Sequence, residues 1–347
     1  MHINFKKVTM EIPGRMLFAF ALMLIFPLAS AQELEKIVIF APGPRNISYL
    51  PVDLIPAIGA DREEGVALKI LHTGGGAVAL NNLVTRNADF AVAGFPAAMS
   101  LSANGGDVVG IAPVDDAPLF VLMVRSELRG QVKRIADLRG KVIGVNTSTR
   151  NSKTTSQQLA ELLLKSDGVD LGMVRIVPAG QSWIEQSSLI NSGTADAVMG
   201  DEPFASRLLD EGKVFFLANL ADPATTRRIA GANFLHATLE TRSDMIRDEP
   251  EKVEKMVRMM VKSLQWIAKH KPEDVVDKLN VTDPEERASL LLALRAYPRA
   301  YSRDGKFSAS QLKETERFFR KTSEGDARAQ GLEIESIIDD RWAGRSK

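Results

Sequence analysis

Cysteine is absent from the 347-residue sequence, and its absence excludes two classes of exported protein. The chain cannot contain disulfides, and it cannot be a bacterial lipoprotein, because lipid attachment requires a cysteine at the cleavage site. Net charge is absent too, since 44 basic residues balance 44 acidic residues. No long-range field therefore draws the chain to nucleic acid, and we predict no nucleic-acid partner.

Motifs for catalysis and metal binding are also scarce. The sequence has only 4 histidines, and it contains neither the H-E-x-x-H motif of zinc proteases nor the G-x-S-x-G motif of serine hydrolases. We therefore predict no catalytic residue, no metal and no cofactor, although hydrolysis by a scattered pair of carboxylates stays open. His72 and His236 could each line a pocket or play a structural role.

The sequence has one long apolar run, "MLFAFALMLIFPL" at 16–28. It follows three basic residues and precedes Ala29-Ser30-Ala31, and its 13 residues are too few for a membrane-spanning helix, which needs about 20. This pattern predicts a secretory signal peptide over residues 1–31, cleaved near Ala31, and a periplasmic location. An uncleaved anchor and a buried helix are the alternatives.

The rest of the chain alternates between predicted strands and predicted helices. Apolar stretches typical of strands lie at 36–40, 65–71, 89–94, 141–145 and 174–180. Segments with helical apolar spacing separate them, which is typical of an α/β fold with a largely parallel sheet. The last third is helical, and the spacing at 249–270 predicts one long amphipathic helix.

Two segments of the sequence resemble each other. Residues 73–98, "TGGGAVALNNLVTRNADFAVAGFPAA", and residues 180–205, "GQSWIEQSSLINSGTADAVMGDEPFA", both predict a loop, a helix, a short strand and a proline-bearing loop. Chance similarity between two α/β units is one interpretation. The simpler one is that the protein has two lobes of like construction.

The glycine-rich stretch at 72–76 raises the possibility of a nucleotide site. Gly74, Gly76 and Ala79 have the spacing of a dinucleotide-binding loop, but Asp89 precedes the next strand instead of following it. No Lys-Ser or Lys-Thr pair follows the glycines, as a phosphate loop would require. What remains is a helix N-terminus that could bind a small anion or a polar ligand edge, or glycines that only permit tight packing.

Polar residues follow the next predicted strands. In "NTSTRNS", Ser148, Thr149 and Arg150 could bind an oxyanion or could simply cap the following helix. In "GDEP", Asp201 and Glu202 could accept hydrogen bonds from an amine or hydroxyl of a ligand, or could be solvated turn residues. Ligands of open α/β sheets bind beyond the carboxyl ends of the strands, so we expect these loops to surround one site.

Three aromatic residues lie in similar loops. Tyr49, Phe95 and Trp183 could pack against the carbon skeleton of a ligand. Gln181 precedes Trp183 in the loop "AGQSW".

In this order, these loops resemble those of the periplasmic substrate-binding proteins of ABC transporters, in the group that handles nitrate, sulfonates, taurine and thiamine-precursor pyrimidines. The resemblance covers most of the chain after the signal peptide. The segments that carry it are "YLPVDLIPAIGADREEGVALKILHTGGGAVALNNLVTRNADFAVAG", "IADLRGKVIGVNTSTRNS", "INSGTADAVMGDEPFASRLLDEG" and "RDEPEKVEKMVRMMVKSLQWIAKHKPE".

The resemblance implies an α/β, two-lobed periplasmic-binding-protein fold of type II, with two mixed sheets flanked by helices and two crossing segments as a hinge. By position, the crossings are expected near 120–127 and 233–240. The expected lobes are residues 32–122 with 236–347, and residues 123–235.

The resemblance also implies the ligand-binding residues. Those expected are Asn46, Tyr49, Thr73, Gly74, Gly75, Phe95, Ser148, Thr149, Arg150, Gln181, Asp201, Glu202 and His236. The sequence departs from the family in two ways that bear on the ligand. The acids of "GDEP" do not favour a site reserved for a bare anion, and the lack of cysteine argues against the cysteine-dependent pyrimidine synthases among the relatives.

The function that the resemblance implies is solute capture without chemistry. We expect a monomer that binds a small polar or anionic organic solute, such as a sulfonate, carboxylate or pyrimidine, and delivers it to an ABC permease in the inner membrane. A receptor for a membrane signalling partner is the first alternative. A secreted enzyme on the same fold is the second.

Overall fold

The structure of the protein is a computed structural model that describes residues 1–2, 33–226, 231 and 233–346. The chain divides into one unit at 1–33 and a second at 34–347, and the fold described here is that of the second. Apart from its first two residues, the predicted signal peptide lies outside the described residues.

The first sheet has the strand order β2-β1-β3-β10-β4. β1 pairs in parallel with β2 and β3, whereas β10 runs antiparallel between β3 and β4. The central strand β3 reads "FAVAG" and is buried throughout, as expected for a strand covered on both faces. The strands are β1 (Glu35–Pro42), β2 (Val66–Thr73), β3 (Phe90–Gly94), β4 (Val109–Asp115) and β10 (Ala237–Thr241).

The second sheet, β7-β6-β8-β5-β9, repeats this plan, with β5 antiparallel in the place that β10 has in the first sheet. The strands are β5 (Phe120–Arg125), β6 (Val142–Val145), β7 (Arg175–Pro178), β8 (Ala197–Asp201) and β9 (Val214–Asn219). The two similar sequence segments occupy equivalent places, because they contain α3-β3-α4 and α6-β8-α7. The predicted two-lobed α/β fold with mixed sheets is confirmed.

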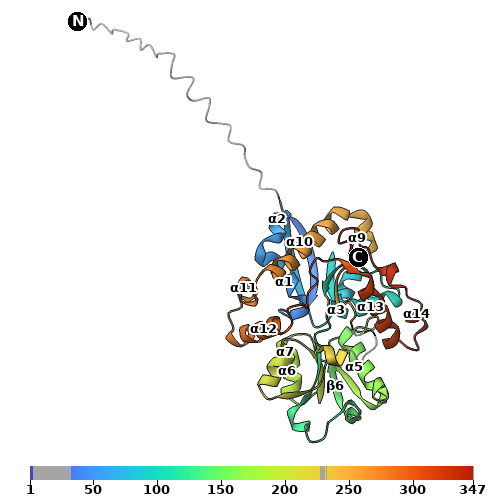
Figure 1. The fold of residues 1–347 in the computed structure, drawn as a ribbon. Helices are drawn as coiled ribbons and strands as arrows, with labels where there is room; N and C mark the ends of the chain where they lie inside the picture. The colour runs from blue at the N-terminus through green and yellow to red at the C-terminus, as the bar shows by residue number, and fades with distance from the viewer. Residues whose placement is uncertain (3–32, 227–230, 232, 347) are drawn as a thin grey trace. The chain divides into compact units, whose positions relative to one another are not determined.

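Helices flank both sheets (Figure 1). Those of the first lobe come from both ends of the described chain, so blue and orange helices stand together in the figure. They are α1 (Leu50–Ile58), α2 (Ala60–Glu63), α3 (Gly76–Val84), α4 (Phe95–Ala103), α9 (Ser243–Asp248), α10 (Pro250–Lys269), α11 (Pro272–Lys278), α12 (Pro284–Ala296), α13 (Ala309–Thr322) and α14 (Ala327–Gln330). Those of the second lobe are α5 (Thr155–Ser166), α6 (Trp183–Asn191) and α7 (Phe204–Asp210).

Short elements complete the described chain. Helix α8 (Pro223–Thr226) follows β9, and β11 (Phe307–Ser308) pairs with β12 (Arg345–Ser346). The 3-10 turns are η1 (Ile47–Tyr49), η2 (Ser126–Leu128), η3 (Ile135–Leu138), η4 (Leu171–Met173) and η5 (Ile334–Ile337).

The chain changes sheets between β4 and β5 and returns between β9 and β10. The first change falls at 116–119, just before the segment in which the sequence placed the crossing. Residues 120–125 are the apolar strand β5 itself, buried except at its last residue. The linker at 116–119 and β5 are adjacent in sequence, and the spacing of residues does not mark where one ends and the other begins.

Helix α13 joins the hydrophobic cores of the two lobes. Phe319 packs with the core between the first sheet and α4, whereas its neighbour Phe318 packs with the core of the second sheet. The Phe318 ring stacks on Phe234, with centroids 4.1 Å apart. One helix therefore contributes to the folding of both lobes.

Glu240 is a carboxyl group buried in the first sheet, where Thr238 donates a hydrogen bond to it. Burial raises the pKa of Glu240 well above its usual value of 4.5. The folded state therefore binds the proton of Glu240 more tightly than the unfolded state does, and protonation of this carboxyl stabilises the fold. This contribution to the free energy of unfolding is complete below the unfolded pKa and is lost as the pH rises through the folded pKa.

We expect the urea midpoint of Glu240→Gln to fall less with rising pH than that of the parent. Glu127→Gln, at an exposed position, is the control. If the urea midpoint changes equally with pH in the parent and in both variants, Glu240 is not the source of the pH dependence.

Candidate functional site

Polar and aromatic side chains from both lobes meet beyond the carboxyl ends of the sheet strands. Asn146 follows β6 directly, Asp201 ends β8, and His236 immediately precedes β10. Each member is at most 3% exposed. We call this set the interlobe cluster, and its members are Asn46, Tyr49, Asp115, Asn146, Thr155, Gln181, Asp201 and His236.

Side-chain amides hold the carboxylate of Asp201. Its Oδ1 accepts hydrogen bonds from Gln181 at 2.8 Å and Asn146 at 3.3 Å, and its Oδ2 accepts one from Gln186 at 2.7 Å. Burial raises the pKa of Asp201, and the amides of Asn46, Gln186 and Gln181 oppose that rise. A carboxylate can only accept, so each amide must turn its N–H₂ group toward it. The carbonyl oxygens of Asn146 and Gln181 have no partner among the described residues.

The ring of His236 is fully buried beside a second carboxylate. Its Nδ1 lies 3.2 Å from Oδ2 of Asp115. This contact places a proton on Nδ1, so Nε2 carries a lone pair in the neutral ring and a second N–H in the charged ring. Phe120 packs edge-on against the ring at 5.0 Å and Tyr49 is tilted against it at 6.1 Å. Nε2 has no partner among the described residues, so it is a hydrogen-bonding atom with aromatic walls.

Gly94 lies where the cluster residues of the two lobes converge. A Cβ at Gly94 would lie 2.2 Å from Oγ1 of Thr155 and 3.7 Å from Nε2 of His236. Like Nε2, this hydroxyl has no partner among the described residues. Two buried, unpartnered polar atoms therefore converge on a backbone that only glycine permits.

The lobes touch through their backbones next to the cluster. The N–H of Thr147 donates to the carbonyl of Gly74 at 3.1 Å, and a Cβ at Gly75 would lie 2.5 Å from the carbonyl oxygen of Thr147. The N–H of Ile47 donates to the carbonyl of Glu202 at 3.4 Å. The two lobes are therefore in direct backbone contact at two places beside the cluster.

A groove of about 340 Å³ lies between residues of α6, α7 and α12. Its walls include Arg45, Ser182 and Pro203, each the chain neighbour of a residue in or beside the cluster. Trp183 forms another wall, and the guanidinium of Arg207 lies 3.9 Å from the centroid of its ring. We call this the mouth groove, and its volume is in the range of small-ligand sites.

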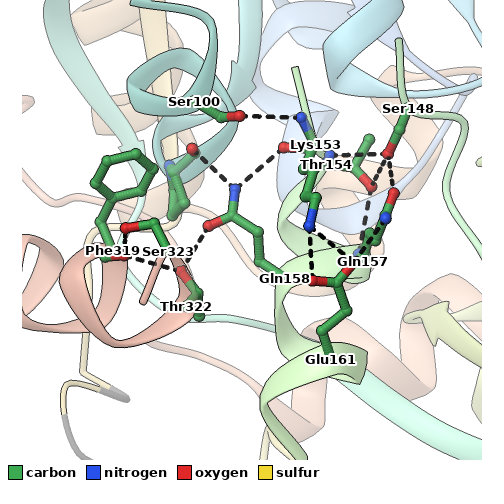
Figure 2. Close-up of polar contacts among 11 residues, drawn as sticks. Ser100, Ser148, Lys153, Thr154, Gln157, Gln158, Glu161, Phe319, Thr322 and Ser323 are labelled. Atoms are coloured by element: carbon green, nitrogen blue, oxygen red, sulfur yellow. Dashed lines mark hydrogen bonds and ion pairs between the residues drawn. The ribbon is translucent and has the colours of Figure 1, made fainter. Parts of the chain in front are cut away.

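Another set of contacts between the lobes lies at the start of α5 (Figure 2). Gln158 donates to the carbonyl of Pro96 at 2.9 Å and accepts from the hydroxyl of Thr322 in α13 at 3.0 Å. The N–H of Lys153 donates to Ser100 in α4 at 3.1 Å. The buried Gln158 thus connects α5 to two helices of the first lobe.

Residues of the loop "NTSTRNS" lie partly in the interlobe cluster and partly at the start of α5. Asn146 belongs to the cluster, whereas Ser148 donates to Gln157 at 2.7 Å and accepts from the N–H of Thr154, within the start of α5 (Figure 2). Arg150 is exposed and lines a separate groove with residues of α4, α5 and α13. The structure therefore does not bring Arg150 to the cluster. The residue that caps α5 is Thr154, whose side chain accepts from the N–H of Gln157, and Ser148 bonds to that cap. The hydroxyl of Thr149 is buried without a partner among the described residues.

Two other expected residues have partners outside the cluster. The Phe95 ring is fully buried in the core of the first lobe, where a Cβ on Gly110 would lie 3.1 Å from it. It is therefore a core residue, because the first turn of α4 directs it away from the cluster. The carboxylate of Glu202 accepts from Ser206 and from the hydroxyl of Tyr297.

The remaining loop residues stabilise the glycine turn or the surface. Thr73 donates its hydroxyl hydrogen bond to the carbonyl of Gly75 at 3.0 Å. His72 is exposed, and its Nε2 lies 3.0 Å from the carboxylate of Asp53. Of the two roles considered for His72, this contact fits the structural one.

The sequence prediction missed Asp115, Asn146 and Thr155. Asn146 could have been found, because it directly follows a predicted strand in a loop that was already singled out. Thr155 lies in the first turn of α5 and Asp115 ends β4. Nothing in their local sequence distinguishes them from residues of ordinary helix starts and strand ends.

Within the residues that the structure describes, no group of three or more histidine, aspartate or glutamate side chains is placed to hold a metal. No helix in the same part of the chain combines the length and the apolar character needed to cross a bilayer.

Comparison with known proteins connects this geometry to a family. The sequence model of the family described as NMT1/THI5 like matches residues 62–274. Among solved structures, a protein of Bordetella bronchiseptica RB50 is similar with a TM-score of 0.80, 20% identity and coverage of 90% of this chain and 96% of that one.

Two further structures have named ligands. The alkanesulfonate-binding protein SsuA of Xanthomonas axonopodis pv. citri, bound to MOPS, has a TM-score of 0.69 and 15% identity, with 89% of this chain and 100% of that one covered. The periplasmic nitrate-binding protein NrtA of Synechocystis PCC 6803 has a TM-score of 0.64 and 10% identity, with 88% and 86% covered. At these identities the likeness shows that the chain shares their fold.

Proposed function

The chain belongs to the NMT1/THI5-like family, and we propose that it captures a small polar solute between its two lobes. It is the extracytoplasmic component of an ABC importer, acts as a monomer in the periplasm and delivers the solute to a permease in the inner membrane. The family and the fold are those of binding proteins. No covalent step is assigned to the interlobe cluster.

The observation that carries this proposal is the set of unpartnered polar atoms in the interlobe cluster. The side chains of Asn46, Asn146, Thr155, Gln181 and His236 each bury a nitrogen or oxygen without a hydrogen bond among the described residues. A buried polar group without a partner costs about 1–3 kcal/mol. A solute that bonds to several of these atoms recovers that cost, which supports a ligand site here.

The position of the cluster supports the same function. Its residues come from the first lobe, from the second lobe and from the segments that lead into β10, so a solute bonded to all of them favours the closed state. The mouth groove lies between α12 of the first lobe and α6 and α7 of the second. It supplies a route to the cluster when the lobes separate.

A thermal-shift screen tests this function. The panel contains nitrate, sulfonates, carboxylates and pyrimidines, each added to the protein that begins after Ala31. A solute at about 100 times its dissociation constant should stabilise the folded state by about 2.7 kcal/mol. Recovery of the bound compound unchanged would support capture without chemistry, whereas its conversion to a product would contradict the proposal.

A further inference from the structure

A groove in the first lobe is lined by no residue of the interlobe cluster. Its walls come from the ends of α10 and α12, from α11 and from the segment that follows α12, and the three helices are orange in Figure 1. Its volume is about 420 Å³, which is in the range of small-ligand sites. We call it the α11 groove, and we propose that it binds a small carboxylate with an apolar body, such as a medium-chain fatty acid. This second site does not depend on solute capture between the lobes.

The first argument is the charge of the walls. Arg303 and His270 line the α11 groove, and no aspartate or glutamate is among the lining residues. The mouth groove, by contrast, contains the carboxylates of Asp283 and Glu286, and the groove beside Arg150 contains carboxylates as well. An anion in the α11 groove therefore meets a cation and no acid in its walls.

The guanidinium of Arg303 is available to a ligand. It is exposed, and no ion pair or hydrogen bond joins it to another residue of the described chain. The carboxylate of its neighbour Asp304 accepts from the backbone N–H of Lys306 at 3.1 Å. In the mouth groove, by contrast, Arg45 is paired with Glu286 at 2.8 Å. A carboxylate can therefore bond to the two parallel N–H groups of Arg303 without displacing a partner.

The second argument is the apolar surface of the groove. Leu264, Val275 and Leu294 line it and are otherwise buried in the core of the first lobe. The rings of Tyr297 and Tyr301 form further walls. A hydrocarbon body that covers these side chains leaves water for an apolar surface, which favours binding. The groove therefore suits an anion with an apolar body better than a small, fully hydrated ion.

The third argument is that hydrogen bonds hold the aromatic walls in place without a ligand. The hydroxyl of Tyr301 donates to the carbonyl of Ile47 at 2.7 Å. The hydroxyl of Tyr297 donates to the carboxylate of Glu202 at 3.3 Å. Because both hydroxyls already have partners, the rings offer a ligand their apolar faces. Walls that are already ordered also reduce the entropy lost on binding.

The first test compares three probes by calorimetry on the protein that begins after Ala31. Octanoate and octylamine have the same hydrocarbon chain and opposite charges at neutral pH, and acetate has the carboxylate without the chain. We expect octanoate to bind more tightly than either of the others by about tenfold or more, because only octanoate uses both Arg303 and the apolar walls. No binding of octanoate, or equal binding of octylamine or acetate, would overturn the proposal.

Two variants locate the bound octanoate. Arg303→Gln removes the positive charge, and we expect it to bind octanoate about tenfold more weakly than the parent. Ala268 lines the groove from an exposed position of α10, so the ring of Ala268→Trp occupies the space of the ligand and should weaken binding as well. If Ala268→Trp does not fold by circular dichroism, Arg303→Gln decides.

Matched controls make the same changes outside the groove. Arg175→Gln removes an exposed guanidinium from β7 of the second lobe, and Ala288→Trp places the ring at an exposed position of α12. Neither should change the affinity for octanoate. Unchanged affinity in Arg303→Gln and Ala268→Trp would mean that octanoate binds elsewhere, the interlobe cluster included, and would overturn the site. Solutes of the thermal-shift panel should still stabilise Arg303→Gln, so a failure of the proposed function is detected separately.

Discussion

Gly75→Ala should weaken solute binding by about fivefold to over a hundredfold without unfolding either lobe. The added Cβ would lie 2.5 Å from the carbonyl oxygen and 2.9 Å from the amide nitrogen of Thr147, in the opposite lobe. Both are backbone atoms, so no change of rotamer relieves the contact. Gly75 has φ 170°, an extended conformation that alanine adopts readily. The substitution is therefore compatible with the first lobe and incompatible with the contact between the lobes.

The magnitude follows from the cost of overpacking. Extra atoms in a well-packed contact cost about 1–3 kcal/mol, which corresponds to a loss of about fivefold to over a hundredfold in affinity. The readouts are calorimetry with the best solute of the panel and the urea midpoint of the free protein. Gly130→Ala is the matched control, because no heavy atom lies within 4 Å of its added Cβ. Undiminished affinity in Gly75→Ala would show that solute binding does not require the contact at Thr147.

The prediction for Gly75 depends on the glycines at 74–76, whose separate roles cannot be predicted from the sequence. The glycines at 74–76 were interpreted as a helix N-terminus open to a ligand or as an aid to tight packing, and the structure gives different reasons for two of them. Gly75 permits contact with Thr147 of the other lobe, whereas a Cβ on Gly76 would lie 3.1 Å from Ala93 of the neighbouring strand. Sequence spacing cannot separate these reasons, because it does not say which backbone faces which.

The fold was more predictable than the site. The strands expected at 36–40, 89–94 and 141–145 differ from the observed β1, β3 and β6 by at most two residues at either end. Apolar runs between helical segments reflect burial in a covered sheet, which is a local property of the sequence. The long helix expected at 249–270 is α10, which begins with Pro250 at its first turn.

The interlobe cluster depends instead on contacts between residues far apart in the sequence. Asp115 and His236 are separated by 121 positions, and their partnership arises only because both crossings pass the same point. Arg150 shows the opposite failure, since an arginine beside a predicted helix start is a natural anion ligand but is exposed beside α13. The direction of a side chain from a loop follows from tertiary packing, which no spacing rule includes.

Phe318→Ala should lower the free energy of unfolding by about 3–5 kcal/mol, the usual cost of removing a buried phenylalanine ring. The ring is fully buried and stacks on Phe234, with 19° between the ring planes. Urea unfolding followed by circular dichroism measures the loss. Phe319→Ala removes the same atoms from the next position of α13, where the ring packs in the core of the first lobe, and should cost a similar amount.

The two variants differ in which lobe they loosen, and that difference tests the role of α13 as a joint between the cores. In Phe318→Ala, amide hydrogen exchange should accelerate most in the second lobe, because its core loses the ring that α13 contributes. In Phe319→Ala, it should accelerate most around α4 and the first sheet. The same exchange pattern in both variants would mean that the two lobes unfold as one cooperative unit, so that the separate contacts of α13 do not stabilise the lobes independently. If the patterns do differ, then movement of the lobes has to occur about α13, because opening that pulled Phe318 out of the second core would incur the same cost of about 3–5 kcal/mol as deleting the ring.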